Sequence, residues 1–162
     1  MDDIYHLFNT VQPVAYGGTG ADNATDARTF LGVADATTAQ YLANVPSLYL
    51  TTDEVNAAGA ILTLPYSAVL SWDMALGLNA TVTLTGNASL LNPSNPIVGR
   101  SGFLNVRQDA TGSRTLSWAA NWEFAGQIAP SLSTTPNAKD KVYYVVESAT
   151  SIVVTGIQRN VG

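Results

Sequence analysis

The chain has 162 residues, of which 46% are hydrophobic and only 12% are charged, and its net charge is −5. This length and hydrophobic content suffice for one domain with a buried core and an appended segment. The absence of cysteine excludes disulfides and thiolate metal sites, and the scattered bases argue against nucleic-acid binding, which needs clustered Lys and Arg.

The charged fraction is about half of the roughly 25% typical of a soluble globular protein. A lone chain with so few charges would expose much neutral or apolar surface, which favours an obligate homo-oligomer. The charge is also uneven. Residues 1–99 carry eight acids and one base, net −7, whereas residues 100–162 carry four acids and six bases, net +2. The C-terminal excess is compatible with an acidic polysaccharide, although a solvated β surface is the commoner explanation.

Residues 2–12 have the apolar spacing of one helical face, which Pro13 ends. The apolar side chains are Ile4, Leu7, Phe8 and Val11. Two interpretations stay open: a peptide that docks the chain to a particle, or a frayed end that packs on its own domain. We favour docking.

Residues 14–33 predict a glycine-rich turn followed by a short helix that Gly32 ends. The residues assigned to attachment and oligomerisation here are Gly17, Gly18, Gly20, Phe30 and Leu31. Two to three turns of helix are too short to be stable alone, so the apolar stripe must pack against another surface. In an oligomer that surface would be the same helix of the symmetry mates.

Residues 34–60 predict a linker with one short helix. The stretch 34–50 lacks clear periodicity, and Pro46 interrupts it. Thr51 and Glu54 then have the spacing of a capping box, and Gly59 stands where a helix would stop.

From about residue 61 the apolar periodicity becomes two, which predicts a mainly β domain over residues 61–162. The clearest predicted strands are 78–84, 88–91, 102–108, 114–118, 141–147 and 151–157. Turn residues at 86–87 and 109–113, and the gap at 148–150, predict hairpins between successive strands. Short strands at regular spacing are typical of an antiparallel β-sandwich of the jelly-roll kind.

Two parts of the chain resemble fibre proteins of tailed phages. The Gly17–Ala21 sequence GGTGA, followed by Ala27-Arg28 and Leu31-Gly32, is similar to a segment of tail-fibre and head-fibre proteins of phages and gene transfer agents. The stretches 84–87, 99–102 and 108–116 resemble a C-terminal β domain of such fibres. The resemblance implies a structural particle component, a trimer, and no defined chemistry. Because a long repetitive shaft is missing, it implies a short fibre, an adaptor or a head spike base.

Binding of a host surface polysaccharide is the alternative function. Aromatic rings beside amides stack on sugar faces, and Trp118, Trp122 and Phe124 cluster in sequence. The same rings are equally suited to the sandwich core, which is the commoner place for large aromatics. Arg107 and Arg114 flank the predicted hairpin loop, where they would meet a carboxylate or sulfate, or pair with Asp109.

No catalytic constellation is recognisable, so we predict no enzyme activity, no cofactor and no metal site. His6 is the only histidine, which excludes histidine triads and clusters. Asp109 and Glu123 form a conceivable glycosidase pair, but Asp109 is better explained as a residue that stabilises a turn.

These observations predict an appendage of a phage or phage-like particle, exposed on its surface and synthesised in the host cytoplasm. Residues 1–33 attach it to capsid or tail proteins, residues 34–60 form the linker, and residues 61–162 project as the β domain. We expect no membrane insertion, because no apolar run approaches the ~18 residues of a spanning helix, and no basic signal sequence precedes the domain.

Overall fold

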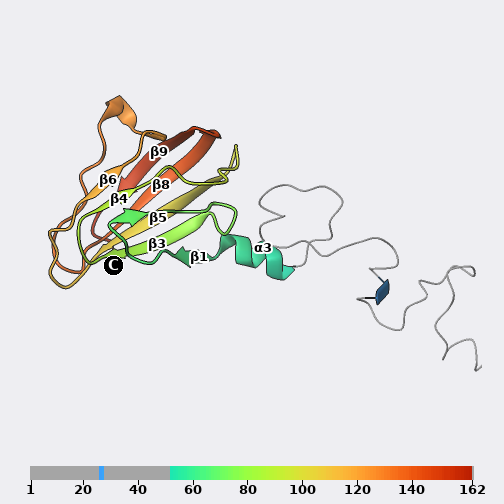
Figure 1. Cartoon of the computed structure of the whole chain (residues 1–162), viewed down its shortest axis with the longest axis horizontal. Coiled ribbons are helices and arrows are strands. Elements are labelled where there is room, and N and C mark those ends of the chain that lie inside the picture. The colour runs from blue at the N-terminus through green and yellow to red at the C-terminus, as the bar shows by residue number, and fades with distance from the viewer. Residues whose placement is uncertain (1–25, 28–51, 162) are drawn as a thin grey trace, which may run out of the picture.

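A computed structural model describes residues 26–27 and 52–161, and the structural statements below concern these residues (Figure 1). From residue 52 onward the regular secondary structure is mainly strands, with one α-helix, which confirms the prediction of a mainly β fold. The elements are α3 (Thr52–Gly59), β1 (Ile61–Thr63), β2 (Val69–Leu70), β3 (Asn79–Leu84), β4 (Ala88–Leu90), β5 (Ser101–Gln108), β6 (Leu116–Trp118), β7 (Trp122–Glu123), the 3₁₀ turn η3 (Ala125–Gln127), β8 (Lys139–Ser148) and β9 (Ser151–Gln158). The helix predicted just before the β domain is confirmed as α3.

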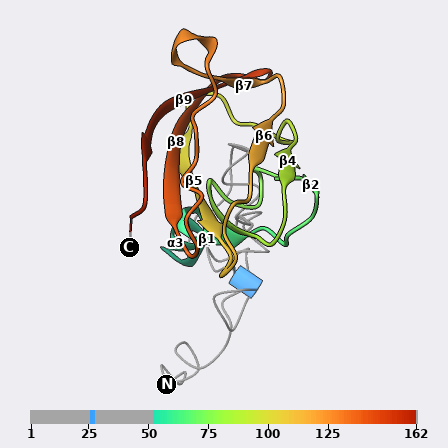
Figure 2. The same ribbon diagram turned by 90° about the vertical axis from the view of Figure 1, so that its left-hand side faces the viewer.

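The strands form two sheets that face each other across the core. The large sheet has six strands in the order β1-β3-β5-β8-β9-β7, and the small sheet has three in the order β2-β4-β6. Figure 2 shows the two layers nearly edge-on, with β5, β8 and β9 on one side and β2, β4 and β6 on the other. Both edge strands of the large sheet are only two or three residues long, which limits unwanted pairing at its edges.

The chain from β1 to β6 winds as a coil, because successive strands alternate between the two sheets. β1, β3 and β5 belong to the large sheet and pair in parallel, while β2, β4 and β6 belong to the small sheet and also pair in parallel. Parallel neighbours need a crossover between them, and here each crossover passes through the opposite sheet. Residues 61–118 therefore make three coils, in the manner of a small β-solenoid.

Apolar side chains stack from coil to coil on the inner side of both sheets. In the small sheet Leu70 is in register with Leu90, which is in register with Trp118. In the large sheet Ala80 is in register with Leu104. The first two leucines, Ala80 and Leu104 are at most 1% exposed. Each fully buried leucine contributes about 1.5–3 kcal/mol of transfer free energy, so the stack is a main source of stability.

A long hairpin completes the large sheet. β8 pairs antiparallel with both β5 and β9, and β7 adds to β9 in parallel. This confirms the hairpin predicted across residues 148–150. Because β8 pairs with β5, the large-sheet strand of the third coil, the hairpin covers a strand edge that would otherwise be unpaired.

Two predictions about strand pairing were wrong. Most strand pairs are parallel, so the domain is a coiled two-sheet structure and not an antiparallel, jelly-roll sandwich. The turns at 86–87 and 109–113 do not close hairpins either, because the strands on their two sides belong to different sheets. Alternation identifies a strand and its buried face, but it says nothing about which strand lies next to it.

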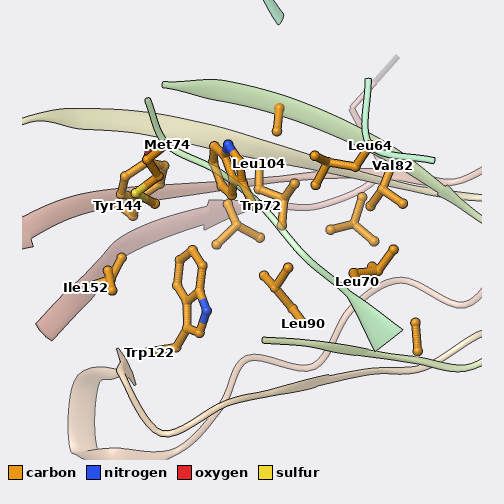
Figure 3. Close-up of a cluster of buried hydrophobic side chains, with 14 of the residues drawn as sticks. Leu64, Leu70, Trp72, Met74, Val82, Leu90, Leu104, Trp122, Tyr144 and Ile152 are labelled. Atoms are coloured by element: carbon orange, nitrogen blue, oxygen red, sulfur yellow. The ribbon is translucent and has the colours of Figure 1, made fainter. Parts of the chain in front are cut away.

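Aromatic rings fill the wide part of the core between the sheets (Figure 3). Trp72 is 1% exposed, and its ring centroid lies 5.5 Å from that of Tyr144 and 6.4 Å from that of Trp122. Trp72 Nε1 donates a hydrogen bond of 3.1 Å to the carbonyl of Gly77. The buried ring therefore keeps its polar atom satisfied while it packs against rings from β7 and β8 of the large sheet.

Tyr144 ties the hairpin to the coil. Its hydroxyl donates a hydrogen bond of 2.5 Å to the carbonyl of Leu78, and burial raises the pKa of the phenol. Gly102 lies at the same place, and a Cβ there would collide with the Leu78 carbonyl and with the Tyr144 hydroxyl. Glycine at 102 is thus required by close approach of the backbone.

Candidate functional site

The loop after β5 is held by a network around Asp109 and Arg114. Asp109 Oδ1 accepts hydrogen bonds from the backbone N–H groups of Thr111 (3.1 Å) and Gly112 (2.8 Å), and Arg114 Nη2 lies 2.9 Å from Asp109 Oδ2. The hydrogen bond from Arg114, followed by these backbone hydrogen bonds, lowers the pKa of the Asp109 carboxyl. The buried amide of Gln108 also bonds both the N–H and the carbonyl of Arg114, each at 2.9 Å. Arg114 therefore holds the loop, and its charge is already paired.

The predicted aromatic cluster contributes mainly to the core. Trp122 is 4% exposed, and its Nε1 donates a hydrogen bond of 3.2 Å to the carbonyl of Leu91. Its ring contacts Trp72, Tyr144 and Trp118 at centroid distances between 5.3 and 6.4 Å. Neighbouring rings thus surround Trp122, and no sugar ring can stack on it in this arrangement. The prediction that Trp122 contacts a glycan is therefore wrong, because this ring belongs to the core.

Trp118 and Phe124 are half-buried at the rim of the same cluster, 5.5 Å apart between ring centroids. Trp118 Nε1 is buried, and it has no hydrogen-bond partner in the part of the chain that the structure describes. Beside Phe124 lies a shallow hollow of about 170 Å³, whose lining is mostly apolar. The hollow is formed by Phe124, Ala125, Ile128, Pro130, Val154, Thr155, Gly156 and Ile157. It has room for a small apolar group, and its lining includes no charged side chain.

Two further hollows lie along the small sheet and the loop beside it. The first, of about 320 Å³, opens over Ser89 and Ser117, whose hydroxyl oxygens are 2.5 Å apart. The second, of about 290 Å³, lies between Arg114, Pro130 and Leu132. Both are open to solvent and contain no unpaired charge, so they offer only weak, unspecific binding.

Arg107 lies apart from Arg114, on the outer face of the large sheet. Its neighbours in β5, Val106 and Gln108, are buried, so strand alternation points Arg107 away from the core. Directly opposite it in the antiparallel ladder stands Lys139 of β8, and Lys141 follows two residues later. The structure thus separates the two arginines that the sequence grouped and places two lysines next to one of them.

The residues predicted to attach and oligomerise the chain, from Ile4 to Leu31, lie outside the described residues. Among the described residues, Asp109 is engaged in its loop, and no group of three or more His, Asp or Glu side chains is arranged to hold a metal ion. Over the same part of the chain, none of the helices has the length and apolar content that crossing a bilayer would demand.

Residues 77–150 match one family. Its description reads "Putative phage tail fibre C-terminal domain". The matched stretch runs from just before β3 to the turn between β8 and β9, and so includes the last two coils and β8. No match was found among the curated proteins or among the solved structures. The family match supports a phage structural appendage protein associated with the virion.

Five side chains on the outer face were not identified as candidates from the sequence: Phe103, Asn105, Lys139, Lys141 and Tyr143. Alternation alone puts Phe103 on the same side of its strand as Arg107, and the two lysines on the same side as Tyr143. The missing information was that β5 and β8 are neighbours, although about 30 residues separate them in sequence. The sequence predicted instead that β5 pairs with the strand at 114–118, so its pairing with β8 was not expected.

Proposed function

We propose that this protein is an appendage of a phage or phage-like particle, attached by its N-terminal segment and projecting the coiled β domain. The family match over residues 77–150 carries the proposal. The fold supports it, since stacked coils with short edge strands form a self-contained unit that can project from a particle. A short fibre, an adaptor and a head spike base all fit this description.

Docking through residues 1–12 is tested by deleting them. Because the coiled domain begins only at Ile61, the truncated chain should keep its β structure by circular dichroism but fail to enter particles. The matched control replaces the same segment by a Gly/Ser linker of equal length, which should fail too. Normal incorporation of either variant would place the attachment elsewhere.

We further propose that the appendage is a homo-oligomer, with a trimer as the expected state. The low charge content supports this, as do the large apolar side chains that the described part of the chain exposes, among them Val98 (61%) and Ile128 (76%). Sedimentation of the full chain should show an oligomer, and a double Phe30→Asp, Leu31→Asp variant should dissociate it. A compact monomer at micromolar concentration would contradict this proposal.

Receptor binding is the second candidate function, because aromatic and cationic side chains meet on one exposed sheet face. That face carries Phe103, Arg107, Lys139, Lys141 and Tyr143. In this case purified protein should adhere to host cells. Particles that incorporate the protein but gain no adherence from it would leave only the structural role.

A further inference from the structure

The outer face of the large sheet carries a cluster of side chains that the core does not use. We call the cluster the outer-face patch; it consists of Phe103, Asn105 and Arg107 from β5 and Lys139, Lys141 and Tyr143 from β8. The register pairs Phe103 with Tyr143, Asn105 with Lys141, and Arg107 with Lys139. Cross-strand partners stand roughly 5 Å apart, so the six side chains form a continuous surface.

The patch concentrates positive charge. Three of the seven basic residues of the chain lie on it, and none of them forms an ion pair with a carboxylate of the described residues. Arg107 and Lys139 face each other directly, an arrangement that destabilises a sheet unless an anion lies between the charges. The neighbouring acid Asp140 points inward, is 1% exposed, and accepts backbone hydrogen bonds from Ser133 and Asn160. The three cations are therefore available to an anionic ligand.

The other half of the patch offers flat aromatic surface. The rings of Phe103 and Tyr143 contact edge to face, 6.5 Å apart between centroids. Lys141 Nζ lies over the face of the Phe103 ring, 4.2 Å from its centroid, so a sugar can stack on that face only once Lys141 has moved to an anionic group of the ligand. The hydroxyl of Tyr143 donates a hydrogen bond of 3.0 Å to Gln158 Oε1. Rings bordered by amides and cations suit sugar rings that carry charged groups.

Asn105 is an unsatisfied polar group in the middle of the patch. Alternation places it on the outer side, between Leu104 and Val106 of the core, yet it is only 8% exposed, and no described residue forms a hydrogen bond with its Oδ1. Leaving a buried acceptor unpaired costs about 1–3 kcal/mol. A hydroxyl that displaced the covering side chains would remove that cost.

We propose that the outer-face patch binds an acidic polysaccharide, with its carboxylates on Arg107, Lys139 and Lys141 and a sugar ring against Phe103 and Tyr143. This inference rests on the proposed function, because a particle appendage meets the polysaccharides of the host envelope. A nucleic acid fits less well, since it needs a longer row of cations than three and the chain as a whole carries a charge of −5.

The test measures binding of the full-length protein to immobilised polygalacturonate, with neutral dextran and dextran sulfate as comparison polymers. Wild-type protein should bind the polyuronate and not dextran, and binding should weaken as salt is added. Arg107→Gln and Lys141→Gln should each weaken binding about fivefold or more, since each removes a charge-assisted hydrogen bond. Stronger binding to dextran sulfate than to polygalacturonate would mean that the patch prefers sulfate to carboxylate groups. That result would overturn the assignment of a polyuronate as the ligand.

Two control variants distinguish specific binding at the outer-face patch from unspecific electrostatic attraction. Arg159→Gln removes the same charge just beyond the end of β9, outside the patch, and should change binding less than twofold. Phe103→Leu changes no charge but removes a ring, and it should still weaken binding severalfold. Equal losses in Arg159→Gln and Arg107→Gln, with no loss in Phe103→Leu, would mean unspecific attraction and overturn the proposal.

Particle incorporation distinguishes failure of this inference from failure of the proposed function. Arg107→Gln and Lys141→Gln should enter particles at wild-type levels, because docking is assigned to residues 1–12. Absence of polysaccharide binding with normal incorporation would overturn the binding site alone. If the wild type binds no polymer and the two variants have a changed sedimentation coefficient, the patch is an interface between copies of the chain. That result would contradict the proposal.

Discussion

The two faces of the large sheet perform different tasks with the same strands. Toward the core, Leu104, Val106 and Tyr144 are at most 3% exposed and stabilise the domain. Toward solvent, Arg107 and Lys141 come from the same two strands, and no carboxylate of the described residues pairs with their charges. Because side chains alternate along a strand, a one-residue shift of register would exchange the two faces. Stability and binding should therefore respond to different substitutions.

The largest effect is expected from Trp72, on the core side. Trp72→Ala should lower the free energy of unfolding by about 3–5 kcal/mol, because it leaves a cavity beside the rings of Trp122 and Tyr144. Urea denaturation monitored by circular dichroism measures this loss. Val98→Ala is the matched control on an exposed side chain and should cost less than about 0.5 kcal/mol. Similar costs for the two variants would contradict the assigned core.

A smaller effect is expected where the hairpin joins the coil. Tyr144→Phe keeps the ring but leaves the Leu78 carbonyl without its hydrogen bond, so the free energy of unfolding should fall by about 1–2 kcal/mol. Phe103→Tyr provides a comparison, since it adds a hydroxyl on the exposed face and should be nearly neutral. If Tyr144→Phe is as stable as wild type, the hydrogen bond does not tie the two parts together.

On the outer face one substitution should raise stability. Asn105→Val removes a buried side chain whose Oδ1 no described residue hydrogen-bonds, and it should increase the free energy of unfolding by about 1 kcal/mol. Asn79→Val is the matched control with the opposite sign. Asn79 bonds the Gly59 carbonyl and the Phe103 N–H, so its replacement should destabilise the domain. A loss of stability in Asn105→Val would show that its amide is satisfied after all.

The smallest effect concerns the loop that leads from β5 to the small sheet. The pKa of Asp109 is lowered in the folded state, so its stabilisation is complete above the ordinary value of 3.8 and is lost as the pH falls through the lower folded value. Asp109→Asn lacks this titration. The difference in melting temperature between wild type and variant should therefore shrink on acidification, and a constant difference would exclude the ion pair as its source.

The sequence predicted strands well and their partners poorly. Alternation located β3, β5, β8 and β9 within a few residues, and the short connection between β8 and β9 identified that hairpin. The coil could not be foreseen, because a tight turn such as 86–87 looks the same whether the next strand returns in one sheet or crosses to another. For the site, Trp118, Trp122 and Phe124 were grouped correctly in space, but their burial depends on Trp72 and Tyr144, which are distant in sequence.

Thermal unfolding with and without polygalacturonate tests the division between the two faces most directly, because a ligand that binds only the folded protein raises its melting temperature. Wild-type protein should melt at a higher temperature when the polymer is present. An Arg107→Gln, Lys141→Gln double variant should keep its own melting temperature unchanged when polymer is added. That temperature need not equal the wild type's, because the substitution relieves the facing Arg107–Lys139 charges. An equal increase in both proteins, or none in the wild type, would contradict the account.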